Sequence, residues 1–483
     1  MTKKTLTLVL LFVAVATIYT YAHVALGFVC PLPWPDESHF IWPAISLSEH
    51  GTFVSPELNP DRAIYWMPPG YMAVLGGIFS VTEPSLAVAR WFSLICVMGA
   101  FALFLLILHR LKFTWLSITL AAAFWLNASF VACGNVARME ALILLLVMAA
   151  LWLLIDGRLW LSIGILALTP LIHPNGLYFF AAGIIPAIVQ WRTADNKPRI
   201  SIIAKALFGL VILLWGLYLW QCIANWKDVS TDLAFQFTRK GERSFLNQVL
   251  DWDNLALLVM LIGWALAKGW RDRTKFPLLG LALAGWLADM VGFEMWYRVY
   301  WVLSALIIGM LFFDSVWAFI LTRMSQVKSW ARYALMTALA STVVLWHYGR
   351  ENLESPFNYP YEMQFFEMSV PDGVTYLTDD DRANVKAIIA AESATRPITV
   401  QFFPRAEALF YLDMRSPVVK LSDPLFYNRK PDLCIFHESK YMPPRWTWFL
   451  GNDMRAVGLE PKNRARYVVF EREDHERWYG FKP

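Results

Sequence analysis

Long apolar runs separated by short polar loops constrain this chain more than any other feature of its sequence. A helix that crosses the hydrocarbon core of a bilayer needs about 20 mostly apolar residues. The composition agrees, because only 17% of the residues are charged, against about 25% in soluble domains. The pattern excludes an ordinary soluble enzyme and predicts a polytopic α-helical membrane protein. We expect about eleven spans, over residues 5–29, 86–108, 113–132, 139–155, 159–172, 175–191, 202–222, 254–268, 276–291, 299–321 and 332–347.

The distribution of charge predicts the orientation of these spans. If the N-terminus is cytoplasmic, every second loop is basic, as the positive-inside rule requires. The opposite loops carry most of the acidic residues, and two of them, 30–85 and 223–253, are long. We therefore expect a transmembrane domain over 1–347 with its long loops outside, in what is best explained as a bacterial inner membrane.

The character of the chain changes after about residue 348, where no run of membrane length remains. Short β-rich segments alternate there with helical patterns near 380–392 and 405–413, which is typical of an α/β domain. Residues 348–483 are therefore predicted to form a soluble extracytoplasmic α/β domain. Its expected strands are Val374–Thr378, Ile398–Phe403, Pro417–Leu421, Leu433–His437 and Tyr467–Glu471.

Two adjacent carboxylates, Asp36 and Glu37, lie where the chain leaves the first predicted span. A carboxylate at an apolar boundary can act as a general base toward a hydroxyl, or bind a metal ion. The alternative is a solvated loop mouth with no chemistry. His39 lies in the same segment and is a further candidate contact.

Arg138 and Glu140 lie at the start of the fourth predicted span. Ionisable groups so near a span are costly unless they are paired or face a cavity. Because they are two residues apart, a helix would point them to different faces. The alternative is an ordinary helix end, where the helix dipole favours Glu140.

Other candidate side chains lie at predicted outer ends of spans. His173 interrupts one long apolar run at His173-Pro174-Asn175-Gly176, and it is either a turn residue or a contact for phosphate or hydroxyl. Tyr297 and Arg298 open the tenth span, where a guanidinium matches phosphate oxygens. An interfacial aromatic belt with a snorkelling arginine is the alternative. The second long outer loop adds a basic cluster, with Arg239, Lys240 and Arg243.

Motifs for known cofactors are missing from the sequence. There is no phosphate-binding glycine loop, no HExxH and no cysteine spacing typical of zinc. No cofactor is therefore indicated, although a divalent metal ion stays an open alternative, with Asp36 and Glu37 as its candidate ligands. The basic residues are dispersed over loops, so nothing indicates nucleic acid as a partner.

Several short motifs follow one another over roughly residues 5–190. They are Pro35-Asp36-Glu37-Ser38-His39, Ser48-Glu49-His50-Gly51, Trp66-Met67-Pro68-Pro69-Gly70-Tyr71, Ala89-Arg90-Trp91-Phe92-Ser93, Arg138-Met139-Glu140-Ala141-Leu142 and His173-Pro174. Their order resembles the GT-C superfamily of membrane glycosyltransferases, especially its protein O-mannosyltransferase and aminoarabinose transferase branches. In this family an acidic residue in the first outer loop, a Pro-Pro helix and an arginine opening the next span recur in this order.

The resemblance implies transfer of a sugar from a polyprenyl-phosphate donor to a hydroxyl acceptor at the outer face of the membrane. By motif position Asp36 would be the catalytic carboxylate, with Glu37 beside it, and Arg138 and Glu140 would line the cavity. The chain departs from the aminoarabinose branch, which has Glu-Lys before Pro-Pro where this sequence has Trp66 and Met67. A single base would give inversion at the sugar carbon.

Two other functions are compatible with the same sequence. A transporter or flippase of lipid-linked sugars would place charged residues at the midplane of broken spans and show repeat symmetry. We find no internal repeat, and Asp289 and Asp314 lie near predicted span ends. A non-catalytic assembly or export component, with 348–483 as its docking module, is the third hypothesis.

Overall fold

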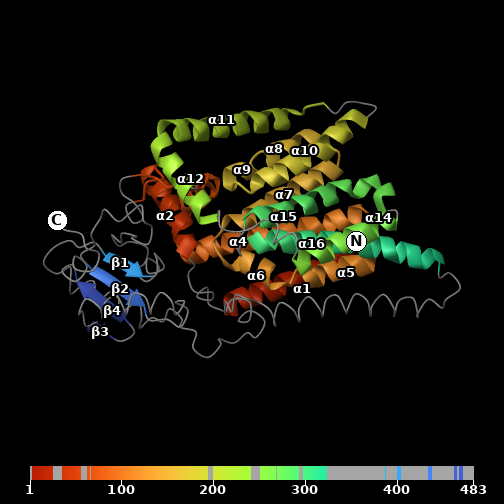
Figure 1. Ribbon diagram of the computed structural model, residues 1–483, viewed down its shortest axis with the longest axis horizontal. Coiled ribbons are helices and arrows are strands. Elements are labelled where there is room, and N and C mark those ends of the chain that lie inside the picture. The colour runs from red at the N-terminus through yellow and green to blue at the C-terminus, as the bar shows by residue number, and fades with distance from the viewer. Residues whose placement is uncertain are drawn as a thin grey trace.

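The fold was obtained as a computed structural model of the 483-residue chain (Figure 1). Everything below concerns the described residues, and for some of them the backbone alone. They are residues 3–25, 35–55, 62–65, 67–193, 199–240, 251–267, 269–292, 297–323, 387, 400–403, 433–437, 462–464 and 467–471.

Helices dominate the described chain up to residue 323 (Figure 1). They are α1 (Lys3–Ala25), α2 (Pro35–His50), α3 (Gly70–Phe79), α4 (Leu86–Arg110), α5 (Trp115–Phe124), α6 (Ala128–Asn135), α7 (Met139–Ile155), α8 (Leu159–Leu166), α9 (Thr169–Ile172), α10 (Gly176–Thr193), α11 (Ile202–Ala224), α12 (Trp226–Lys240), α14 (Trp252–Leu266), α15 (Phe276–Gly292) and α16 (Arg298–Arg323), with short 3-10 turns η1 (Gly269–Arg271) and η2 (Arg273–Lys275).

Each predicted span up to residue 321 coincides with a helix or a broken helix, whereas 332–347 lies outside the described residues. Within the described chain, four helices are long and apolar enough to cross a membrane, or five if the bent pair α5 and α6 counts as one span. Several shorter apolar helices, including α7, accompany them. These helices fit a polytopic helical membrane protein.

Local sequence signals set the helix boundaries. Ser85 and Thr114 cap α4 and α5 by accepting hydrogen bonds from backbone N–H groups of the first turn. The predicted break at residues 173–176 is confirmed, because α9 ends before it and α10 begins at Gly176. Gly176 is required there, since a Cβ would lie 2.2 Å from the Thr169 carbonyl oxygen.

The core of the bundle consists of α4 packed on α7 and α6, and of α15 packed on α16 and α10. Aromatic side chains fill its centre, where the Trp125 ring stacks on Phe130 at 4.2 Å between centroids. In the first long loop, helix α2 turns Phe40, Ile41 and Trp42 into the interior of the protein. The side chains of α2 are therefore tied to the bundle.

Four strands are described after residue 399: β1 (Val400–Phe403), β2 (Leu433–His437), β3 (Lys462–Arg464) and β4 (Tyr467–Glu471). They form one mixed sheet in the order β1-β2-β4-β3, with β1 and β2 parallel and the other pairs antiparallel. Three predicted strands match β1, β2 and β4, and β3 was not predicted. The other expected strands and helices of the C-terminal domain lie outside the described residues.

Candidate functional site

The carboxylate of Glu37 is fully buried and bound to the guanidinium of Arg90 on α4. Arg90 Nε and one terminal nitrogen donate to the two carboxylate oxygens over 2.9 and 2.8 Å. The backbone N–H of Ala137 donates to the same carboxylate over 2.7 Å. This bidentate, charge-assisted arrangement fixes α2 against α4 and against the turn between α6 and α7.

Arg138 and Glu140 also form a buried ion pair, with N–O distances of 3.1 and 2.9 Å. The expectation that these side chains point to different faces is wrong. Arg138 is the N-cap of α7 and its backbone is extended, so its side chain folds back over the first turn. Two residues then meet at a spacing that a continuous helix would keep apart.

His173 and Tyr297 are brought together from chain positions 124 residues apart. The N–H of Asn175 donates to His173 Nδ1 over 3.0 Å, so in the neutral ring the proton is on Nε2. His173 Nε2 lies 3.0 Å from the Tyr297 hydroxyl, to which it therefore donates. Both side chains are buried, and the Tyr297 ring stacks on Tyr300 of α16. The pair joins the α9–α10 turn to the start of α16.

These groups gather where α2 meets the bundle, and we call Glu37, Arg90, Arg138, Glu140, His173 and Tyr297 the α2 end. The Arg138 guanidinium lies 6.0 Å from the centre of the Phe40 ring on α2. Tyr300 is within electrostatic range of both Glu140 and Arg138. The α2 end therefore combines two ion pairs with a neutral hydrogen-bonded pair.

Other predicted site residues lie elsewhere or are not fully described. Arg298 donates to Asp253 of α14 over 2.6 Å and covers the Trp301 ring at 4.0 Å. His39 is buried on α2. Only the backbone is described for the remaining helical candidates, and Arg243 lies outside the described residues. The candidates with backbone alone are Asp36 on α2 and Arg239 and Lys240 on α12.

Two ionic partners had no role in the expectations drawn from the residues themselves. Arg90 was noted only as part of a motif, and its charge inside an apolar run signalled a buried partner. Asp232 was counted only among the acidic residues of the long loop. It binds Arg62 bidentately across 170 residues of sequence.

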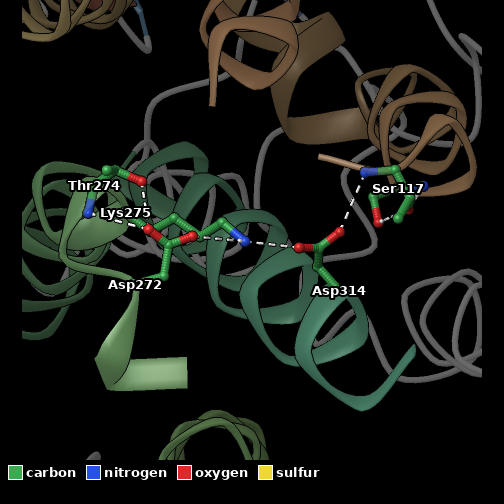
Figure 2. Close-up of polar contacts among 6 residues, drawn as sticks. Ser117, Asp272, Thr274, Lys275 and Asp314 are labelled. Carbon is green, nitrogen blue, oxygen red and sulfur yellow. Dashed lines mark hydrogen bonds and ion pairs between the residues drawn. The ribbon is translucent and has the colours of Figure 1, made fainter. Parts of the chain in front are cut away.

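A separate ionic cluster, which we call the η2 end, consists of Thr114, Asp272, Lys275 and Asp314 (Figure 2). Lys275 Nζ lies 2.7 Å from Asp314 and 3.5 Å from Asp272, and 4.6 Å from the centre of the Phe113 ring. The N–H of Thr114 donates to Asp314 over 3.1 Å. At about 1.5 Å per residue, Asp314 is roughly 24 Å along α16 from its first residue, so the two ends are well separated.

The described residues contain no group of three or more His, Cys, Asp or Glu side chains suited to a metal ion. Glu37 has both oxygens engaged by Arg90 and the Ala137 N–H group. A carboxylate that already neutralises a cation in this way does not fit as a ligand of a divalent metal.

Comparisons with known proteins give a distant likeness. No protein-family model and no curated protein sequence matches the chain. Two structures of ArnT from Cupriavidus metallidurans, a GT-C aminoarabinose transferase, are similar over 95% of this chain and 97% of theirs. The apo structure has 14% identity and a TM-score of 0.47, and the structure bound to undecaprenyl phosphate has 15% and 0.41.

Proposed function

We propose that this chain is a GT-C-like glycosyltransferase of the bacterial inner membrane. It transfers a sugar from a polyprenyl-phosphate donor to the hydroxyl group of an acceptor, which is a glycolipid, a glycan or a protein. In this proposal the N-terminus is cytoplasmic, the α2 end faces outward, and residues 348–483 form an extracytoplasmic domain. The orientation follows from the basic loops, which favour the cytoplasmic side.

The observation that carries the proposal is the collection of buried ionisable groups at the α2 end. Charged side chains inside a membrane bundle are costly unless they are paired or face a cavity. Glu37, Arg138 and Glu140 come from two different chain segments, and each is paired. His173 and Tyr297 add a hydrogen-bonded pair beside them. Together they supply donors, acceptors and positive charge at one place.

The reaction needs a base and a group that stabilises the departing phosphate. We assign the base to Asp36, whose backbone is held in α2 by the ion pair of its neighbour Glu37. Asp36 takes the acceptor hydroxyl proton while the oxygen attacks the sugar carbon. The bond from that carbon to the phosphate oxygen breaks, and polyprenyl phosphate leaves with the electron pair. One displacement of this kind inverts the configuration of the sugar carbon.

Three groups at the α2 end suit the phosphate of the donor. Arg138 offers a guanidinium whose charge is shared with Glu140, and His173 and Tyr297 offer polar atoms at one place. Glu37 has a positioning role in this scheme, because Arg90 and the Ala137 N–H group engage its oxygens. Arg298 pairs with Asp253, as Arg138 pairs with Glu140, and is a further candidate contact for the phosphate.

Replacing the proposed base gives a direct test. Asp36→Asn keeps the size of the side chain but removes its basicity, so sugar transfer should fall by about 100-fold or more. The measurement is transfer of labelled sugar from polyprenyl-phosphate donors in membranes. Candidate sugars come from mass profiling of glycolipids and glycans in a deletion strain. Glu49→Gln is the matched control, because Glu49 is an exposed acid on the same helix.

The control variant should transfer sugar at the rate of the unmodified enzyme. Normal transfer by Asp36→Asn at normal expression would remove Asp36 from the mechanism. Movement of the donor lipid across the membrane without any covalent transfer would instead favour the transporter hypothesis.

A further inference from the structure

The carboxylate of Asp232 on α12 is a buried acceptor at a contact between the two long loops. Arg62 donates to its two oxygens over 3.0 and 2.7 Å. The backbone N–H of Tyr65 donates to the same carboxylate over 2.9 Å. The side chain of Asp232 is only 3% exposed. Three hydrogen bonds to one buried carboxylate make a rigid joint, because bidentate guanidinium pairing fixes orientation as well as distance.

This joint is a buried polar attachment of α12 to the first long loop. Val229 is buried one turn before Asp232, whereas Trp226 is exposed. The hydroxyl groups of Ser230 and Thr231 donate to the helix's own Lys227 carbonyl. Asp232 therefore ties α12 to residues 62–65.

The segment that Asp232 holds leads directly to the candidate site. A few residues beyond Tyr65, Gly70 begins α3 in close contact with the end of α9, where a Cβ on Gly70 would lie 2.4 Å from the Leu171 carbonyl oxygen. The helix α9 ends at Ile172, and the next residue is His173, which binds Tyr297. The joint at Asp232 therefore lies near in sequence to the contact between Gly70 and Leu171, which directly precedes His173.

We propose that Asp232 is a positioning residue that holds residues 62–65 against α12, and that these two segments form one wall of the donor site, near the end of α9 and His173. It acts through Arg62 and the Tyr65 N–H group and does not touch the reacting atoms. The inference rests on the proposed function, because it assigns to this wall the binding of the polyprenyl-phosphate donor. Loss of the joint then weakens donor binding and leaves the chemical step nearly intact.

Two substitutions test the joint by kinetics. Asp232→Ala and Arg62→Gln should each raise the KM for the polyprenyl-phosphate sugar about tenfold and change kcat by less than about threefold, because uniform binding is lost. Asp156→Asn is the matched control, since it removes another Arg–Asp contact that is exposed and lies at the start of the α7–α8 turn. The control should leave both constants unchanged. An unchanged KM in both test variants, or an equal loss of kcat, would overturn the proposal.

Hydrogen exchange provides a readout that does not depend on activity. The Tyr65 amide donates to Asp232, so its exchange should be at least tenfold faster in Asp232→Ala than in the unmodified protein. It should be unchanged in Asp156→Asn. Equal protection of Tyr65 in all three proteins would show that the joint does not form.

A cross-link distinguishes a positioning role from general damage to the fold. Arg62→Cys combined with Asp232→Cys, bridged by a short bis-methanethiosulfonate that forms a disulfide with each thiol and releases methanesulfinate, should restore the low KM, and reduction should raise it again. A bridged enzyme with a persistently high KM would contradict the inference. If the unmodified protein neither binds nor transfers from the donor, the proposed function fails. If the unmodified protein binds the donor and transfers its sugar, and the variants do so equally well, only the role of Asp232 fails.

Discussion

The α2 end and the η2 end both bury charged side chains in the same helical bundle, but they differ in what accompanies the charges. At the η2 end Lys275 bridges Asp272 and Asp314, and Asp314 also accepts a backbone N–H (Figure 2). The α2 end adds the hydrogen-bonded pair of His173 and Tyr297, an imidazole and a hydroxyl that can each donate or accept a hydrogen bond. Buried charge alone therefore does not identify a site, whereas charge beside a histidine and a tyrosine indicates chemistry.

The largest effect should come from breaking the η2 end. Asp314→Ala leaves the buried Lys275 without its nearest carboxylate, and loss of one partner of a buried pair costs about 3–5 kcal/mol. The free energy of unfolding in detergent should fall by that amount, while transfer per folded molecule stays within about twofold. The double variant Lys275→Met with Asp314→Leu should recover most of the loss, since apolar residues often replace buried ion pairs. A large loss of transfer by folded Asp314→Ala would erase the distinction between the two ends.

An intermediate effect should come from the α2 end, where a substitution should lower sugar transfer much more than stability. Tyr297→Phe removes the hydroxyl that accepts from His173 and keeps the ring that stacks on Tyr300. We expect transfer to fall by about 10- to 100-fold, and unfolding free energy by only about 1 kcal/mol. Tyr19→Phe is the matched control, because the buried Tyr19 hydroxyl donates to the Trp125 carbonyl away from the site. Tyr19→Phe should lower the free energy of unfolding about as much as Tyr297→Phe does, and it should leave sugar transfer unchanged.

The smallest effect concerns Asp272 at the η2 end. Burial acts to raise the pKa of this carboxyl, but hydrogen bonds from Thr274 and the charge of Lys275 outweigh it and leave the pKa below its usual value. A carboxyl with a lowered folded pKa stabilises the protein above its unfolded value, about 3.9, and this stabilisation disappears as pH falls through the folded value.

The Asp272 side chain is almost half exposed, so solvent screening keeps its contribution to about a few tenths of a kcal/mol. The unfolding temperature of Asp272→Asn should therefore be slightly lower than that of the unmodified protein at pH 5–7. The two curves should converge as the pH falls below about 3.9 and through the folded pKa of Asp272. A difference that grows as the pH falls would contradict the sign of this pKa shift.

Helix positions were predictable because apolar runs of membrane length and their breaks are local properties of the chain. The turn at His173-Pro174-Asn175-Gly176 was correct for this reason, as were the strands that match β2 and β4. The break between α8 and α9 was missed although Pro170 marks the first turn of α9, and the strand β3 was missed because it has no strong local signal. Proline and glycine mark the turn at residues 173–176, whereas β3 is a three-residue polar strand that pairs with β4.

The sequence by itself determined that this chain forms apolar helices and that acids and bases lie at their ends, because hydropathy and charge are read residue by residue. Only the tertiary structure decided the partners. Glu37 binds Arg90, Asp232 binds Arg62, and His173 binds Tyr297 over sequence separations of 53, 170 and 124 residues. Such pairings follow from how helices pack against one another, since buried charges and hydrogen-bonding groups must find partners wherever the packing brings them.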